Sequence, residues 1–144
     1  MTHKLGQVFL IDPNIINKII ELVKDEGIQK NWLEIGCGEG ALTQPLIDQI
    51  SSLDVVEIDE DCITKTVQML GDTASEKINF IKKNIVQYQL EKKTSIVTNL
   101  PYYLSAKWVK WVIQERQWIE SAIVMLQKEF GEKLFAKPGE KVYT

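Results

Sequence analysis

Hydrophobic residues along this chain follow two patterns, short apolar runs and stripes that repeat at helical spacing. Apolar runs of about four to eight residues predict buried strands, whereas apolar residues three or four positions apart predict amphipathic helices. The predicted strands cover residues 32–35, 53–58, 78–81, 94–98 and 122–126. The predicted helices lie before, between and after them, at about 13–26, 42–50, 60–70, 108–113 and 130–135, with a loop at 71–75.

Cap residues support the boundaries of the first predicted helix. Asp12 suits the N-cap, Pro13 suits the first helical position, and Gly27 suits the position after the last turn. Strands that alternate with helices predict an α/β fold, a mostly parallel sheet with helices on both faces. Because residues 142–144 resemble the start of a further strand, we expect one domain over residues 1–144 that is truncated before its last strands.

The composition, with 44% apolar and 26% charged residues, is that of a globular protein and argues against disorder. No apolar run reaches the roughly 18 residues of a membrane-spanning helix, and the N-terminus lacks an apolar signal region. We therefore expect a cytoplasmic protein with no membrane partner, whose Cys37 and Cys62 are free thiols. The formal net charge of −3 argues against binding nucleic acid by overall charge, but a local basic patch is compatible with it.

The segment Asn99-Leu100-Pro101-Tyr102 follows the predicted strand 94–98, and ligands bind at the carboxyl ends of strands in open α/β sheets. Pro101 stiffens the turn and keeps Leu100 out of the helical region. The loop then presents an amide side chain, a free backbone carbonyl and an aromatic ring. Those groups suit a planar base that carries an amino group. The same residues are also compatible with a strand-ending turn whose Asn bonds its own backbone.

Glycines at positions 36, 38 and 40 follow the first predicted strand and precede a helix. Glycine permits a tight turn and a close approach of a ligand to the backbone, and the helix adds unpaired N–H groups. Glu57, 21 residues after Gly36, lies where a carboxylate accepts ribose hydroxyls. These features suit an adenosyl ligand. Because Gly36-x-Gly38-x-x-Ala41 also satisfies the looser dinucleotide fingerprint, an NAD-type oxidoreductase remains an alternative.

Glu34 lies two residues before Gly36. A carboxylate that faces the cofactor would attract a cation such as a sulfonium with its amino group, and it would repel a pyrophosphate. On this interpretation Glu34 favours a sulfonium cofactor over NAD. The plain alternative is a surface residue of the strand.

Together these motifs resemble the S-adenosylmethionine-dependent rRNA adenine N6,N6-dimethyltransferases of the KsgA and Erm type. The resemblance covers nearly the whole chain, in segments 6–10, 34–43, 56–59, 99–105, 125–129 and 141–143. The start Gly6-Gln7 and the segment Leu126-Gln127-Lys128-Glu129 favour the KsgA, small-subunit branch. The resemblance implies a Rossmann-like class I methyltransferase domain, here without its last strands and without the small helical RNA-binding domain.

The resemblance also implies residue roles, with S-adenosyl-L-methionine as cofactor. The expected cofactor contacts are Val8, Leu10, Glu34, Gly36, Gly38, Glu57, Asn84 and Asn99. The expected catalytic segment is Asn99, Leu100, Pro101 and Tyr102, which would hold the target adenine by its N6 group and by stacking. Catalysis would consist mostly of positioning.

The implied activity is dimethylation of adenine N6 in ribosomal RNA, with 16S rRNA favoured, within an immature small ribosomal subunit. We expect a monomer that uses no metal. Val8 stands where the family usually has Asn, and Asn84 where it usually has Asp. These two departures and the truncation motivate an alternative, a non-catalytic RNA-binding or ribosome-assembly protein with the same fold.

Overall fold

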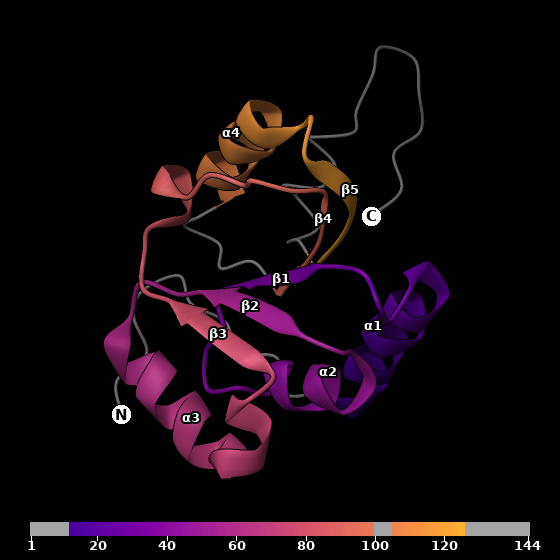
Figure 1. The fold of residues 1–144 in the computed structure, drawn as a ribbon, viewed down its shortest axis with the longest axis vertical. Helices are drawn as coiled ribbons and strands as arrows, with labels where there is room; N and C mark the ends of the chain where they lie inside the picture. The colour runs from indigo at the N-terminus through magenta and orange to yellow at the C-terminus, as the bar shows by residue number, and fades with distance from the viewer. Residues whose placement is uncertain (1–11, 100–104, 126–144) are drawn as a thin grey trace.

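The computed structural model describes residues 12–99 and 105–125, in which five strands form one parallel sheet in the order β3-β2-β1-β4-β5 (Figure 1). The strands are β1 (Trp32–Ile35), β2 (Leu53–Val56), β3 (Ile78–Ile81), β4 (Thr94–Asn99) and β5 (Ile119–Met125). The helices are α1 (Pro13–Glu26), α2 (Thr43–Gln49), α3 (Glu60–Ser75), α4 (Ser105–Glu115) and the short 3₁₀ helix η1 (Ile85–Gln87). The predicted α/β fold is confirmed, and the predicted helix 130–135 lies outside the described residues.

The sheet separates two hydrophobic layers, with α1, α2 and α3 on one face and α4 with η1 on the other (Figure 1). Because successive strand residues point to opposite faces, β1 sends Trp32 into the first layer and Leu33 into the second. All four residues of β1 are buried, as expected for the centre of a parallel sheet.

The predicted boundaries of α1 are confirmed. The Asn14 amide donates to Asp12 Oδ1 at 2.9 Å, and Pro13 occupies the first helical position. Gly27 ends the helix at φ +139°, and its N–H donates to the Val23 carbonyl at 3.0 Å. This end of α1 is joined to the sheet because Trp32 Nε1 donates to the Gly27 carbonyl at 2.8 Å.

Other predicted boundaries were wrong, for local reasons. The expected loop at 71–75 belongs to α3, which kinks where Gly71 takes φ +73° and then resumes. β5 begins at Ile119 rather than at residue 122, because polar residues interrupt the apolar run at its start. Both polar residues have partners: Glu120 binds Lys30 at 2.8 Å, and the Ser121 hydroxyl bonds Ser95 Oγ at 2.8 Å.

Two further boundaries differ by a few residues. β2 ends at Val56, two residues before the predicted end, so that Glu57 follows the strand instead of belonging to it. α4 is longer than the apolar stripe 108–113 from which it was predicted, because polar residues occupy both of its ends.

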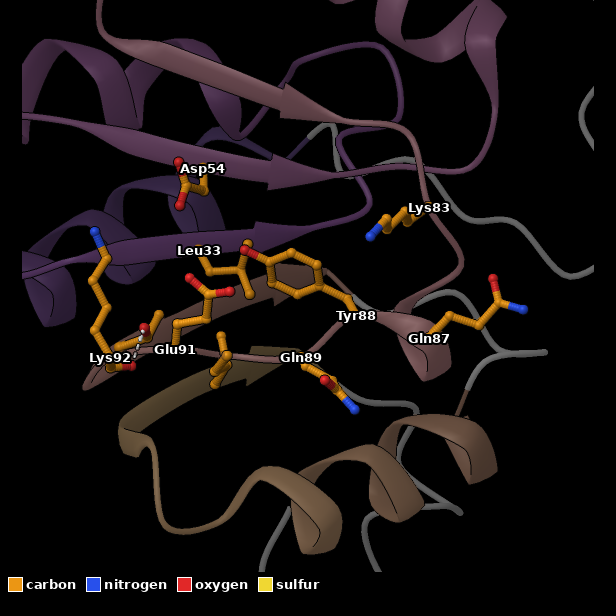
Figure 2. Close-up of a pocket in the computed structure, with 10 residues that line it drawn as sticks. Leu33, Asp54, Lys83, Gln87, Tyr88, Gln89, Glu91 and Lys92 are labelled. Carbon is orange, nitrogen blue, oxygen red and sulfur yellow. Dashed lines mark hydrogen bonds between the residues drawn. The ribbon is translucent and has the colours of Figure 1, made fainter.

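On the second face, the segment after η1 crosses the sheet back to the start of β4 (Figure 2). Helix α4 and the turn that follows it hold this segment through three polar contacts. Trp111 Nε1 donates to the Tyr88 carbonyl at 2.8 Å, and the Leu90 amide donates to Glu115 Oε1 at 2.7 Å. Lys93 Nζ donates to the Gln117 carbonyl at 2.6 Å, just beyond the helix. The segment and α4 therefore form one packed unit.

The two buried tryptophans of α4 provide a matched test of this packing. Trp111 Nε1 has the Tyr88 carbonyl as its partner, whereas Trp108 Nε1 is buried with no partner among the described residues. Both Trp→Phe changes remove a ring, but only Trp111→Phe leaves a carbonyl unpaired. We expect Trp111→Phe to cost about 1–2 kcal/mol more than Trp108→Phe in the free energy of unfolding, measured in urea. Equal losses would contradict this assignment.

Candidate functional site

The carboxyl ends of the central strands meet at one edge of the sheet, where hydrogen bonds hold them together. The Gly36 amide donates to the Val56 carbonyl at 2.8 Å, which joins the end of β1 to that of β2. The Thr98 hydroxyl donates to the Ile35 carbonyl at 2.5 Å, which joins β4 to β1. The loops that follow β1, β2 and β4 therefore begin side by side.

Glu57, at the end of β2, binds the glycine-rich loop directly. Its Oε1 accepts from the amides of Cys37 at 3.0 Å and Gly38 at 3.4 Å, and its Oε2 accepts from the amide of Asp59 at 3.0 Å. The residue is 7% exposed. The Cys37 thiol is a weak fourth donor, also to Oε1, at 3.7 Å. Oε2 accepts from Asp59 alone among the described residues, and since each carboxylate oxygen has about two lone pairs, Oε2 has room for one further donor. The predicted ribose contact of Glu57 therefore fits one hydroxyl beside the loop amides.

The glycines of the loop have different surroundings. A side chain at Gly36 (φ +77°) would meet no atom within 4 Å, so the backbone there is open to a ligand. A side chain at Gly40 (φ +92°) would lie 2.4 Å from Met69 Cε and 3.2 Å from Thr66 Cγ2. Gly40 therefore allows the loop to pack on α3, where the Thr66 hydroxyl also bonds the Gly38 carbonyl at 3.3 Å.

Glu34 lies inside the fold, which corrects the prediction of a carboxylate that faces the cofactor. It is 1% exposed, and its Oε1 accepts from the Thr43 hydroxyl at 2.6 Å, between β1 and α2. Burial raises the pKa of Glu34 to about 8, with a smaller contribution from the nearby charge of Glu57. The side chain is therefore mostly protonated at neutral pH, and it joins two elements instead of presenting a charge.

Asn84 lies after β3, half-buried, at the start of η1. Its Oδ1 accepts from the Val86 amide at 3.2 Å and so caps the short helix. This bond orients the amide and leaves the second lone pair of the oxygen for a ligand. The predicted contact of Asn84 with an adenine amino group stays a prediction.

Asn99 is the last residue of β4, which is one residue longer than the predicted strand 94–98. It pairs in register with Met125 of β5. It therefore starts from a fixed position at the site edge. The predicted contacts Val8 and Leu10 lie outside the described residues, and so do Leu100, Pro101 and Tyr102. Their roles stay predictions.

Ile58 is a candidate site residue that the sequence interpretation missed. It follows Glu57 directly and is 51% exposed, although the apolar run 53–58 predicted a strand residue there. A large apolar side chain beside a ribose-type carboxylate offers contact area to a planar base. A signal was present in the sequence, because Asp59 follows at once and indicates that the strand has ended.

The prediction that both cysteines are free thiols is confirmed. Cys37 and Cys62 are both buried free thiols. Burial raises the pKa of the Cys37 thiol, and a buried thiol that stays protonated is a poor nucleophile. Within residues 12–99 and 105–125, no group of three or more His, Cys, Asp or Glu side chains could hold a metal ion. The same residues include no helix that is long and apolar enough to cross a membrane.

A pocket of about 420 Å³ lies away from this edge, on the second face of the sheet (Figure 2). Leu33 and Asp54 of the strands line it on one side, and residues of the segment 87–92 line it on the other. Tyr88 lies in the wall of this pocket. Its pKa is raised mainly by burial, and less by the negative charges of Asp54 and Glu91. Because the glycine-rich loop and Asn99 do not line this pocket, it is separate from the candidate site.

Comparisons with known proteins agree with this geometry. The family model described as "Ribosomal RNA adenine dimethylase" matches residues 1–144. A curated relative from Mycoplasmopsis pulmonis, named ribosomal RNA small subunit methyltransferase A, is 33% identical over 143 residues. The match covers 98% of this chain and 55% of the relative. The chain thus spans about half the length of the curated relatives it matches.

Solved structures are similar over most of the chain. The structure of the 23S rRNA methyltransferase ErmE superposes with a TM-score of 0.73 at 26% identity, over 88% of this chain and 50% of that one. A dimethyladenosine transferase from Plasmodium falciparum superposes with a TM-score of 0.75 at 28% identity, over 92% of this chain and 48% of that one. The predicted Rossmann-like fold of class I methyltransferases is thereby confirmed.

The two glycine environments predict different costs for the same substitution. Gly36→Ala and Gly40→Ala both place a side chain at positive φ, which costs about 1–2 kcal/mol. Gly40→Ala also forces Met69 and Thr66 to move, and overpacking typically adds about 1 kcal/mol or more. We expect Gly40→Ala to lower the free energy of unfolding more than Gly36→Ala, measured in urea. A larger loss for Gly36→Ala would contradict the packing of Gly40 on α3.

Burial of Glu34 predicts a pH-dependent stability. Its pKa is about 8 in the folded chain, against 4.5 for the unperturbed group, so the folded state binds more protons between these values. Stability then falls as the pH rises through that window. Relative to Glu34→Gln, which stays neutral, we expect the wild type to lose on the order of a few kcal/mol between about pH 5 and pH 8. Urea unfolding at each pH measures this difference.

The exposed Glu39, five residues along the chain, provides the matched control. Glu39→Gln removes the same charge from a solvated position, and we expect it to keep the pH dependence of the wild type. If Glu34→Gln showed the wild-type pH dependence as well, Glu34 would not be the group that titrates.

Proposed function

The chain belongs to the ribosomal RNA adenine dimethylase family, and from this premise we propose that it binds S-adenosylmethionine and methylates adenine N6 in ribosomal RNA. The convergence of three groups at one sheet edge carries the proposal. These groups are the open backbone at Gly36, the carboxylate of Glu57 and the amide of Asn99 at the end of β4. The residues are those that an adenosyl cofactor and a target base require.

For the cofactor, this edge offers distinct contacts to each part of an adenosyl ligand. Gly36 lets the methionine portion approach the backbone, and Glu57 accepts a ribose hydroxyl. Ile58 offers apolar area to one face of the adenine ring, and Asn84 offers its oxygen to the adenine amino group. Val8 and Leu10 complete the proposed set from the N-terminal segment.

The chemistry follows from positioning. S-adenosylmethionine supplies the methyl group as an electrophile. The target N6 is a poor nucleophile, because its lone pair is delocalised into the adenine ring. Hydrogen bonds from N6–H to Asn99 and to the Leu100 carbonyl favour a pyramidal nitrogen and aim its lone pair, while Tyr102 stacks on a base taken out of its helix. The proton on N6 leaves to water after transfer.

The name of the curated relatives supports a more specific RNA substrate. Their name specifies the small ribosomal subunit, which supports 16S rRNA within an immature small subunit as the substrate. We propose a cytoplasmic monomer that acts without a metal. The relation to ErmE, a 23S rRNA methyltransferase, keeps large-subunit RNA as the alternative substrate to test.

The two rival functions stand differently. An NAD-type enzyme loses its support through the family relationship alone. The buried Glu34 presents no charge that would exclude a pyrophosphate, so it no longer argues against NAD. A non-catalytic RNA-binding or assembly protein keeps one supporting observation, the Asn84 oxygen that is already engaged as a helix cap. It predicts RNA binding without turnover.

Asn99→Ala tests the proposed function. We expect the wild type to bind S-adenosylmethionine in calorimetry and to incorporate methyl groups into immature small-subunit RNA. Removing the amide should lower the turnover number by on the order of a hundredfold or more, because the lost hydrogen bond orients the nucleophile. Cofactor affinity should fall by less than about tenfold, since Asn99 is one of several contacts.

The control is Asn79→Ala, which removes the same side chain from an exposed position on β3. It should match the wild type in both measurements. A wild-type chain that binds the cofactor and RNA but transfers no methyl group would favour the non-catalytic alternative, and NAD binding would support the oxidoreductase.

A further inference from the structure

Positive charge is concentrated in one stretch of an otherwise acidic chain. Residues 92–118 contain five cationic side chains, namely Lys92, Lys93, Lys107, Lys110 and Arg116, and a single carboxylate, Glu115. Five positive charges and one negative charge give +4, whereas the whole chain has a net charge of −3. The stretch includes Asn99 and all of α4.

The one carboxylate of this stretch points inward. Glu115 is 6% exposed, and its two oxygens accept from the Leu90 amide at 2.7 Å and from Gln114 Nε2 at 3.1 Å. Its hydrogen bonds hold the segment that crosses the sheet. It therefore does not offset the lysines on the surface of α4.

The outer side of α4 is a continuous exposed face. Trp108 and Trp111 are buried against the sheet. Exposed residues recur at helical spacing on the other side, and this face consists of Ala106, Lys107, Lys110, Ile113 and Gln114. Lys107 and Lys110 are neighbours on the helix surface, because they are three residues apart. Ile113, at 57% exposed, extends the face with an apolar side chain.

The lysines of this face have no acidic partner among the described residues. Other lysines of the chain do: Lys30 binds Glu120 at 2.8 Å, and Lys82 binds Glu60 at 3.0 Å. An unpaired pair of cations on one helix face is suited to two anionic groups at regular spacing, as on a nucleic-acid strand.

The position of α4 in the fold indicates which part of the RNA its lysines would contact. The helix starts six residues after Asn99, beyond the carboxyl end of β4, so its first turns lie near the proposed position of the target adenine. We propose that the outer face of α4 binds the RNA strand that flanks this adenine, with Lys107 and Lys110 on its phosphates and Ile113 against a sugar or base. The inference rests on the proposed function for the identity of the target.

Such contacts have a measurable signature. Each phosphate neutralised by a lysine releases counterions, and the slope of log K against log salt changes by roughly 0.7 for a single strand and roughly 0.9 for a duplex. Two lysines therefore account for a slope of roughly 1.4 to 1.8. Lysine acts here as a point charge without bidentate geometry, so the face would hold the strand without reading its sequence.

The test compares a double variant with two matched variants. Lys107→Gln/Lys110→Gln removes both charges. Lys107→Arg/Lys110→Arg keeps them, and Lys18→Gln/Lys24→Gln removes two exposed charges from α1 on the opposite face. For each we would measure affinity for immature small-subunit RNA at several salt concentrations, KM and kcat for methylation, and affinity for S-adenosylmethionine.

We expect the Lys107→Gln/Lys110→Gln variant to bind RNA about tenfold more weakly at low salt, with a slope reduced by roughly 1.5. KM for RNA should rise, while kcat at saturating RNA and cofactor affinity stay at the wild-type level. The Arg variant and the α1 variant should both behave like the wild type.

An unchanged salt slope in the Gln variant, or an equal loss in the α1 variant, would overturn the proposal. Polyglutamate serves as a probe for an acidic protein partner. If the Gln variant kept its affinity for RNA but lost affinity for polyglutamate, the face would suit an acidic protein and the proposal would be overturned. The two proposals fail separately. A wild type that binds RNA through this face without methylating it refutes the proposed function alone, and a methylating enzyme with an unchanged slope refutes only this inference.

Discussion

The contact between the Glu57 carboxylate and the amides of the glycine-rich loop determines the shape of the candidate site. It joins the residue after β2 to the loop after β1, so the two halves of the proposed adenosyl site form as one unit. The loop amides would otherwise be buried without partners, at a cost of about 1–3 kcal/mol each. The glycines then make distinct contributions, because Gly36 leaves space for a ligand and Gly40 permits contact with α3.

The same arrangement explains why a second acid nearby is neutral. Glu34 has one hydroxyl donor, from Thr43, and lies almost wholly out of solvent. Burial, and to a smaller extent the adjacent charge of Glu57, favour its protonated form and outweigh the hydrogen bond from Thr43, which favours the ionised form. Two neighbouring acids therefore have different tasks. Glu57 organises the loop with its lone pairs, and Glu34 joins β1 to α2 as a neutral group.

Much of this could be predicted from the sequence, because buried strands and capped helices have strong local signals. The cap at Asp12 and the loop with Gly36 are examples. The orientation of Glu34 could not be predicted, since spacing does not reveal which side of a buried strand faces the cofactor. The start of β5 was missed because Glu120 interrupts the apolar run, and Lys30, which binds its exposed carboxylate, is 90 residues away in the sequence. Such partners are set by the fold and not by the local pattern.

The proposed RNA substrate requires this acidic protein to keep its negative charge away from the nucleic acid. Here that separation follows from the fold. The first turn of α3 carries Glu60 and Asp61 on the face of the sheet opposite α4, while the carboxylate of Glu115 is used inside the second face. The cations of α4 thus lie near the proposed position of the target base, and the one acid of their own helix does not compete with them. The negative net charge then favours binding in one orientation, because the acidic surface away from α4 repels RNA and disfavours non-specific contact.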